Sequence, residues 1–408
     1  MKGTIRLKCR ECGREHPPIQ AYACEDCFGP LDVVYDYDQI HLNKSVIQSR
    51  PRTLWRYFNL LPIEDPSNIV DLSAGWTPLH KSRGLAEFLG LKNLYIKNDT
   101  VNPTYSFKDR PASIAVSKTL EFGAKAIGCA STGNLAAAIA AHAAKAGIKC
   151  YVFIPRGVEA SKIAQTSVFG AEIIAIKGTY DDANRLAAQA AEAYGLILAN
   201  INIRPYYVEG SKTLTYEVCE QLNWNLPDHV IVPAASGALV CATSKAFKEL
   251  QKLNLVKEGK VKISLAQPGG CSPIVDAFKS GANDVTPVEK PDTIAKSLAI
   301  GDPGDGIYAL RVVRESGGTA EYATNEEIIE ATLLLAKTEG IYAEPAGSIT
   351  VAVLKKLVET GKIAPDDVVV CYVTGSGLKT PEIIVDAALK PIEIEPTLRM
   401  LEKVIKKV

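Results

Sequence analysis

From about residue 91 onward, short apolar runs alternate with longer segments of helical periodicity. We predict buried strands at residues 94–97, 126–130, 150–154, 173–176, 230–232, 263–265 and 368–373. We predict helices between and after them, at residues 107–122, 135–146, 181–194, 325–338, 347–358 and 381–389. Wholly apolar strands that alternate with helices are typical of parallel sheets covered on both faces. The pattern therefore predicts an α/β protein, and 408 residues are enough for two such sheets.

The beginning and the end of the chain depart from this alternation. A β-like run follows residue 30, and residues 41–75 hold arginines, prolines and Trp55 with little periodicity, as in a segment that wraps around a core. Residues 401–408 read as a short amphipathic helix. We divide the chain into residues 1–40, 41–228 and 229–408, and we expect the two larger parts to interleave in space.

Four cysteines near the start form two CxxC pairs, separated by eleven residues. Each pair can present two thiolates to one ion from a tight turn, and two turns complete a tetrahedron. The spacing predicts a zinc ribbon with Zn²⁺ bound by Cys9, Cys12, Cys24 and Cys27. His16 is interpreted as a surface residue, because four thiolates already close the site.

Charge and hydropathy narrow the partners and the compartment. Lys+Arg and Asp+Glu both number 46, and this balance argues against binding to nucleic acid or to an anionic membrane. The first residues show no signal pattern, and the apolar run 136–146 is broken by His142 and Lys145. We expect a cytoplasmic protein that acts on a small molecule and whose remaining cysteines are reduced thiols.

Lys108 is the strongest candidate for chemistry. It follows a Pro/Ser turn and begins a predicted helix. The positive end of a helix dipole and a desolvated pocket both disfavour the ammonium form, and an uncharged lysine can attack a carbonyl. This is the setting of a Schiff-base lysine that holds pyridoxal 5'-phosphate (PLP). Taken alone, a lysine at a helix start is usually a surface residue, but three other loops favour the cofactor.

These three loops also follow predicted strands, where ligands collect in open α/β sheets. In residues 131–134, Asn134 can reach a phenolic oxygen, and the hydroxyls and N–H groups before it can hold a carboxylate. Residues 233–238 are small enough for the backbone to close around a phosphate. Residues 373–377 place the hydroxyl of Thr374 where it can face a pyridine nitrogen.

Six motifs together resemble the threonine synthase family. They occur in collinear order within about residues 70–390, at residues 102–110, 129–134, 208–213, 315–318, 344–346 and 374–379. That family belongs to the tryptophan-synthase-β-like PLP enzymes of fold type II, and many prokaryotic members carry a similar ribbon. The resemblance implies two parallel-sheet α/β domains with the active site between them, and a small N-terminal zinc ribbon.

The resemblance also implies roles for individual residues. Lys108 would bind PLP and then move the α-proton, Asn134 would contact the PLP ring oxygen, and Thr374 would face the ring nitrogen. Ser131 and Thr132 would hold the substrate carboxylate. The PLP phosphate would lie in a cradle formed by Ala234, Ala235, Ser236, Gly237 and Ala238.

The sequence differs from the family pattern at several positions, including residues 105, 207, 302 and 376. Tyr105 stands where glycine is frequent, and Tyr207 stands where many relatives have an arginine thought to contact the substrate phosphate. We assign that contact to Arg204 and Lys212, which flank Tyr207, because arginine binds phosphate in a bidentate manner and lysine binds it as a point charge.

The implied reaction converts O-phospho-L-homoserine and water to L-threonine and phosphate, in a homodimer by analogy with the fold type. Two other PLP activities stay open, namely threonine/serine dehydratase and cysteate synthase. A different class would be a nucleic-acid-binding or regulatory protein with a degenerate enzyme domain. The zero net charge and the intact Lys108 argue against that class.

Overall fold

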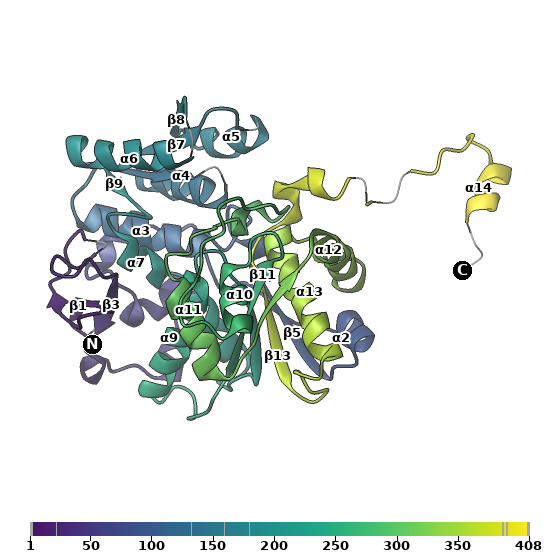
Figure 1. Ribbon diagram of the computed structural model, residues 1–408, viewed down its shortest axis with the longest axis horizontal. Helices are drawn as coiled ribbons and strands as arrows, with labels where there is room; N and C mark the ends of the chain where they lie inside the picture. Colours follow the sequence, from purple (N-terminus) through teal and green to yellow (C-terminus); the bar gives the residue numbers. More distant parts are fainter. Residues whose placement is uncertain are drawn as a thin grey trace.

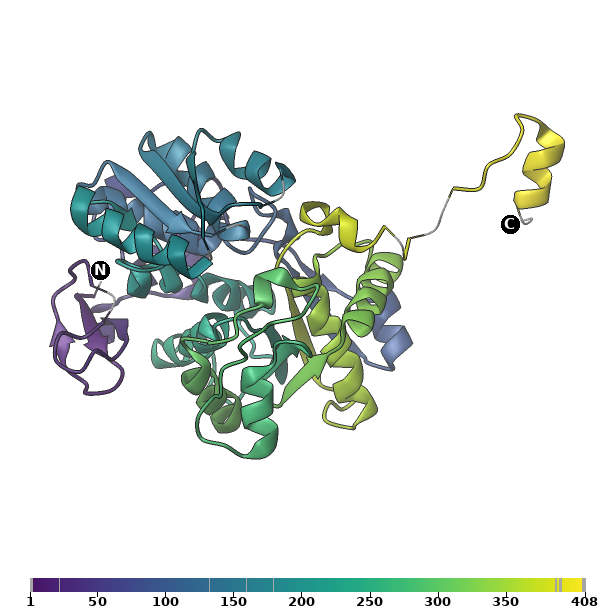
Figure 2. The same ribbon diagram turned by 45° about the horizontal axis from the view of Figure 1, so that its top comes forward.

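Three β-sheets organise the computed structural model (Figure 1), which describes residues 3–405 except 22, 132, 159, 179, 386, 389 and 390. The smallest sheet is antiparallel, with strand order β2-β1-β3. Its strands are β1 (Ile5–Cys9), β2 (Glu15–His16) and β3 (Leu31–Tyr35). It carries the four ribbon cysteines and lies at one side of the molecule (Figure 2).

The largest sheet has six strands in the order β12-β11-β10-β13-β5-β4. Its strands are β4 (Leu79–Lys81), β5 (Asn93–Asn98), β10 (His229–Pro233), β11 (Lys262–Pro268), β12 (Ala320–Ala323) and β13 (Val368–Val373). All neighbours are parallel except β4 and β5. The sequence did not predict β4 or β12, because strands of three and four residues at the sheet edges give little periodic signal.

The third sheet has four parallel strands in the order β8-β7-β6-β9. Its strands are β6 (Ala126–Ala130), β7 (Lys149–Pro155), β8 (Glu172–Ile176) and β9 (Ile197–Leu198). The helices of this part are α3 (Asp109–Glu121), α4 (Asn134–Ala146), α5 (Ala160–Ser167) and α6 (Tyr180–Tyr194). Together with the six-stranded sheet, it confirms the predicted pair of parallel-sheet α/β units.

Further helices surround the large sheet or connect the parts. They are α1 (Lys44–Gln48), α2 (Gly84–Leu89), α7 (Arg204–Glu209), α8 (Lys212–Gln221), α9 (Ala238–Lys252), α10 (Pro273–Ser280), α11 (Gly306–Ser316), α12 (Asn325–Glu339), α13 (Pro345–Glu359) and α14 (Leu398–Val404). None of the helices in the described part of the chain is long and apolar enough to cross a membrane. The start of α12 is fixed by the local sequence, because Thr324 and Glu327 form a capping box there.

The division at residue 228 does not coincide with the division between the sheets. Strand β5 pairs with β13 along its whole length, from Val368 opposite Asn93 to Val373 opposite Asn98. Figure 1 shows the early helix α2, drawn in blue, beside the late helices α12 and α13. The large sheet therefore takes its strands from both sides of the small α/β unit in the chain.

Two predicted helices near the end of the chain need correction. Residues 381–389 contain only a short 3-10 turn, η7 (Pro381–Ile383), within the described residues. Val385 is 64% exposed, so this segment lacks the buried face that a short helix needs for stability. The terminal helix α14 begins three residues earlier than predicted, because the Thr397 side chain accepts a hydrogen bond from the Met400 N–H.

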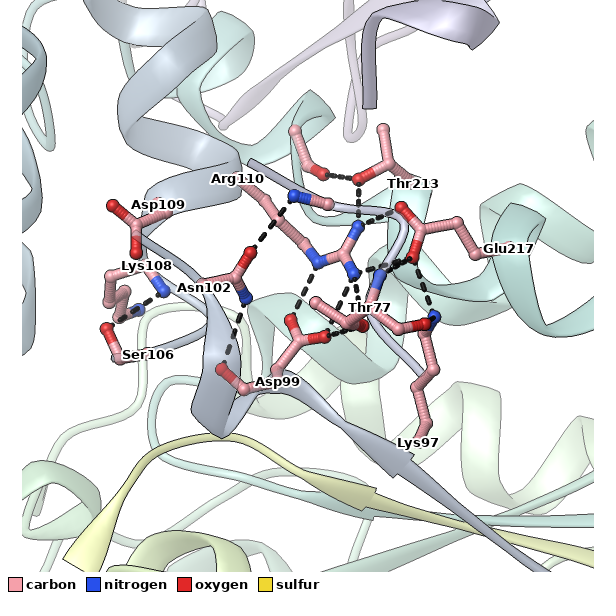
Figure 3. A network of polar contacts seen from close by, with 12 residues as sticks. Thr77, Lys97, Asp99, Asn102, Ser106, Lys108, Asp109, Arg110, Thr213 and Glu217 are labelled. Atoms are coloured by element: carbon pink, nitrogen blue, oxygen red, sulfur yellow. Dashed lines mark hydrogen bonds and ion pairs between the residues drawn. The ribbon is translucent and has the colours of Figure 1, made fainter. Parts of the chain in front are cut away.

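A fully buried ionic network joins the two α/β units directly beside Lys108 (Figure 3). Arg110 of α3 donates from Nε to Asp99 Oδ2 (2.7 Å) and from Nη2 to Glu217 Oε2 of α8 (2.8 Å). Lys97 of β5 donates to the same Glu217 oxygen at 2.7 Å. All four side chains are 0% exposed, and their two positive and two negative charges balance.

Glu217 shows how strongly the partners compensate for burial. Burial alone raises the pKa of a carboxyl group, but Arg110 and Lys97 outweigh it and lower the pKa of Glu217 to about 2. The lowered pKa means that the carboxylate stabilises the fold above its ordinary pKa near 4.5 and loses this contribution as the pH falls toward 2.

We expect Glu217→Gln to destabilise the protein by about 3–5 kcal/mol at pH 7, because it leaves two buried cations with one buried anion. The thermal unfolding midpoint at several pH values measures this, and the difference from the parent should shrink as the pH falls below about 4.5. The control is Asp366→Asn, which breaks the exposed pair with Lys92 and should change little. Equal effects of the two substitutions would contradict the assigned role.

Candidate active site

Lys108 lies at the carboxyl edge of the six-stranded sheet, where the loop after β5 enters α3. It is the cap residue of α3, as predicted, and its backbone N–H donates to Ser106 Oγ at 3.3 Å (Figure 3). The side chain is half-buried, and its Nζ lies 5.4 Å from the centroid of the Phe107 ring and 5.9 Å from that of Tyr207. The amine thus sits against two aromatic faces at the start of a helix of 13 residues.

Backbone hydrogen bonds hold the loop before Lys108 against two other segments. Phe107 N–H donates to the Thr374 carbonyl at 2.7 Å, and Ser376 N–H donates to the Tyr105 carbonyl at 3.0 Å. Glu344 N–H donates to the carbonyl of Gly375 at 2.9 Å. Backbone hydrogen bonds therefore connect the loops after β5 and β13 and the start of α13, and we call these three segments the floor of the site.

Tyr105 supports this floor from a strained conformation. Its φ is 63°, in the left-handed region that glycine adopts without a penalty. The position is thus one where glycine, frequent among relatives by the resemblance, would fit the backbone, and Tyr105 instead exposes 58% of its surface. Its carbonyl is fixed by Ser376, which helps to keep the backbone in that conformation.

Asn134 reaches this floor from the other sheet. It begins α4, directly after the carboxyl end of β6, and its Nδ2 donates to both oxygens of Glu344, at 2.9 and 3.0 Å. Burial raises the pKa of Glu344, although Asn134, Lys379 and Lys108 oppose the shift. The structure thus brings Lys108, Asn134 and Thr374 to one place between the sheets.

Ser131 lies at the end of β6, just before this helix. It is half-buried, and its Oγ accepts a 3.4 Å hydrogen bond from the N–H of Gly133. Thr132, the second residue predicted to hold a carboxylate, lies outside the described residues. The hydroxyl of Thr374 makes no hydrogen bond within the described part of the chain, so it is available to a ring nitrogen.

The loop after β10 has the features of a phosphate cradle. The N–H groups of Ala235, Ser236 and Gly237 make no hydrogen bond to any described residue, and they precede the N-terminus of α9. Gly237 has φ 92°, and a Cβ there would lie 2.8 Å from the Asp305 carbonyl oxygen. The cradle is fastened by Asp305, whose N–H donates to the Ser236 carbonyl at 2.9 Å.

These groups fit PLP. Strands β5, β13 and β10 are neighbours, so the lysine, the free Thr374 hydroxyl and the free N–H groups at residues 235–237 follow adjacent strand ends. An amine for the aldehyde carbon, a polar partner for the ring nitrogen and an anion site for the phosphate are contacts by which proteins hold this cofactor. The placement of these residues supports PLP binding, and their individual roles stay predictions.

Arg204 and Lys212 have different surroundings. Arg204 begins α7 on the same helix as Tyr207, and its guanidinium is 24% exposed and pairs with Asp305. Lys212 is 0% exposed, and its ammonium pairs with Glu209 at 2.7 Å and Glu249 at 2.9 Å. Lys212 is therefore not available to a substrate phosphate as predicted, and we assign it a structural role.

Asp109, the residue after Lys108, forms a second buried contact with His142. Burial raises the pKa of Asp109 to about 6, although the N–H and hydroxyl of Thr104 donate to its Oδ2. His142 Nδ1 lies 3.8 Å from Asp109 Oδ1, and burial lowers the pKa of the imidazole to about 4. This pair packs α3 on α4, in agreement with the prediction that His142 is a packing residue.

The four ribbon cysteines converge. Cys9 Sγ lies 3.4 Å from Cys27 Sγ, Cys12 Sγ lies 3.7 Å from Cys24 Sγ, and all four sulfurs lie within 4.8 Å of one another. Tetrahedral Zn–S bonds of about 2.3 Å place sulfurs about 3.8 Å apart, so the cluster fits one ion. His16 lies in a second, overlapping group with Cys24 and Asp26. The remaining six cysteines are also free thiols.

Three site residues were not predicted individually. Glu344 holds Asn134, Asp305 fastens the cradle, and Tyr207 faces Lys108. A signal existed for Glu344, since it precedes Pro345 at a helix start within one of the six motifs. The sequence around Asp305 gives no comparable signal.

Comparisons with known proteins show the family of the chain. Residues 70–375 match the family described as pyridoxal-phosphate dependent enzymes. A threonine synthase of Methanocaldococcus jannaschii is 42% identical over 98% of this chain and 99% of its own length. A threonine synthase of Methanosarcina acetivorans is 41% identical over 98% of both chains.

Solved structures with lower identity share the fold. A threonine deaminase isoform of Solanum lycopersicum has a TM-score of 0.66 at 21% identity, over 83% of this chain and 96% of its own. A diaminopropionate ammonia lyase of Escherichia coli has a TM-score of 0.65 at 16% identity, over 94% and 96%. The α/β architecture is thus that of fold type II PLP enzymes. With its full-length similarity to these relatives, the chain belongs to the pyridoxal-phosphate-dependent enzymes and, among them, to the threonine synthases.

Proposed function

We propose that this protein converts O-phospho-L-homoserine and water to L-threonine and phosphate at the site around Lys108. The observation that carries the proposal is the convergence of Lys108, Asn134, Thr374 and the cradle between the two sheets. The convergence occurs in a chain that is 42% identical, over nearly its whole length, to a threonine synthase.

Each residue of the site has a separate role in the proposed reaction. PLP, when bound, supplies an electron sink for negative charge that develops on the substrate carbons. Lys108 takes the α-proton with its Nζ, and Phe107 and Tyr207 shield that amine from water. Asn134 orients the cofactor ring, and Thr374 offers the ring nitrogen an uncharged hydroxyl. Ser131 and Thr132 hold the substrate carboxylate beside the N-terminus of α4.

The substrate phosphate is the group that leaves. In the overall change the Cγ–O bond breaks, Cβ loses a proton and gains the hydroxyl of water, and Cγ becomes a methyl group. Arg204 binds the phosphate and stabilises its charge as it departs. The partial exposure of Arg204 supports this role, and so does its position on the same short helix as Tyr207, which faces Lys108.

The ribbon binds structural Zn²⁺ through Cys9, Cys12, Cys24 and Cys27. Four thiolates close the coordination shell, so the ion has no open position for substrate. Assembly as a homodimer and a cytoplasmic location stay predictions. The dehydratase and cysteate synthase activities are alternatives that the assays below distinguish by their substrates.

Lys108→Ala should lower the turnover of O-phospho-L-homoserine by about a thousandfold or more, because the proton-transfer group is lost. Phosphate release and threonine formation measure this, and the visible absorption of the bound cofactor should change as well. The exposed Lys125→Ala is the control. Normal turnover by Lys108→Ala would remove the central assignment.

Arg204→Met should raise the KM for O-phospho-L-homoserine about tenfold or more, with the cofactor absorption unchanged. Arg185→Met, which breaks an exposed pair with Asp182 on α6, is the matched control. L-threonine and L-serine, assayed in parallel for 2-oxo acids, test the dehydratase alternative, and phosphoserine with sulfite tests cysteate synthase. An unchanged KM would place the substrate phosphate elsewhere.

Cys9→Ser should release the metal of the ribbon, about one equivalent per chain, because a hydroxyl is a poor ligand for this ion. Elemental analysis of the purified protein measures the metal. Cys241→Ser, on α9, keeps all four ribbon thiols and should retain the metal. Equal metal content in the two variants would show that the cluster does not bind it.

A further inference from the structure

Arg10 connects the ribbon to the body of the protein. It lies in the turn between Cys9 and Cys12, and its guanidinium binds two carboxylates outside the sulfur cluster. Its Nη2 donates to Asp32 Oδ1 within the ribbon at 2.6 Å, and its Nη1 donates to Asp305 Oδ1 at 2.8 Å. The guanidinium also lies 4.7 Å from the ring centroid of Tyr308 on α11.

Asp305 is the residue on which three parts meet. Its side chain is 1% exposed, one carboxylate oxygen accepts from Arg10, and the other pairs with Arg204. Its backbone N–H donates to the Ser236 carbonyl of the phosphate cradle. A single buried aspartate therefore contacts the ribbon, the proposed substrate-phosphate arginine and the cofactor cradle.

The charges around Asp305 determine how strongly the Arg204 guanidinium attracts a phosphate. Arg10 and Arg204 carry two positive charges, and Asp32 and Asp305 carry two negative charges. Because Asp305 is shared with Arg10, it neutralises Arg204 only in part and leaves it attractive to an anion. Without Arg10, the buried Asp305 carboxylate would pair with Arg204 alone. A phosphate would then have to compete with this complete ion pair for the Arg204 guanidinium.

We propose that Arg10 is a positioning residue for the phosphate end of the active site, acting through Asp305 on Arg204. This inference rests on the proposed function, since it takes Arg204 as the group that binds the substrate phosphate. It gives the ribbon a role in substrate affinity through its contact with Asp305.

The turn that carries Arg10 has a proposed metal ligand at each end. Arg10 N–H donates to the Pro30 carbonyl at 3.0 Å, and Cys9 N–H donates to the Arg14 carbonyl at 2.9 Å. Cys9 and Cys12, one on each side of Arg10, belong to the sulfur cluster. A bound ion would fix both ends of this turn and so fix the direction in which the guanidinium points.

The test compares Arg10→Met with Arg14→Met in the PLP-loaded protein. Both substitutions remove an arginine of the ribbon, but Arg14 pairs with Asp26 at 61% side-chain exposure and does not contact the body through that pair. Arg10→Met should raise the KM for O-phospho-L-homoserine about tenfold with kcat little changed, and Arg14→Met should leave both constants near those of the parent.

Three further readouts separate positioning from loss of structure. Arg10→Met should keep its metal content and its cofactor absorption, and it should bind inorganic phosphate about tenfold more weakly in calorimetry. Arg10→Lys keeps the charge, but its ammonium cannot span both carboxylates as the guanidinium does, so it should recover only part of the affinity. A matching KM rise in Arg14→Met, or loss of metal from Arg10→Met, would overturn the proposal.

The outcomes also separate this inference from the proposed function. Threonine formation by the parent with unchanged kinetics in Arg10→Met would refute the positioning role and leave the function intact. If the parent releases no phosphate from O-phospho-L-homoserine but Arg10→Met still binds inorganic phosphate more weakly, the positioning role holds and the substrate assignment fails.

Discussion

The buried group of Lys97, Asp99, Arg110 and Glu217 is the constraint on which the site depends. It joins β5, α3 and α8, and Arg110 follows Lys108 by two residues. Separating one partner from such a network leaves a buried charge without compensation, which is strongly destabilising. The network therefore fixes where α3 begins, and with it the place of the lysine amine between two sheets that could otherwise shift relative to each other.

Much of the fold follows from the sequence, because a buried parallel strand must be apolar throughout. Residues 368–373 and 230–232 show this directly, and both are central strands of the large sheet. The elements that were missed or wrongly predicted lie at sheet edges or on the surface. Strand β12 is short and lies at an edge, and among the described residues of 381–389 the apolar Val385 is 64% exposed. Periodicity predicts which face is apolar, and it does not show whether a partner surface exists.

The site was predictable where chemistry follows a strand end and unpredictable where it depends on distant neighbours. Lys108, Asn134 and Thr374 could be found because each follows an apolar run. Asp305 acquires its importance from Arg10, 295 residues earlier, and from Arg204, 101 residues earlier. The prediction that Lys212 binds the substrate phosphate could not foresee its ion pairs, since only the folded chain brings Glu209 and Glu249 to its ammonium.

The position of β13 has a consequence for biosynthesis on the ribosome. This strand is the last of the large sheet in the chain, yet it is inserted between β10 and β5. Strand β5, which precedes the loop of Lys108, therefore has no neighbour in its own sheet, apart from the short antiparallel β4, until residue 373 has emerged. Because such long-range pairing is slow, the edge of β5 stays open for most of translation and is the surface that a chaperone would need to protect.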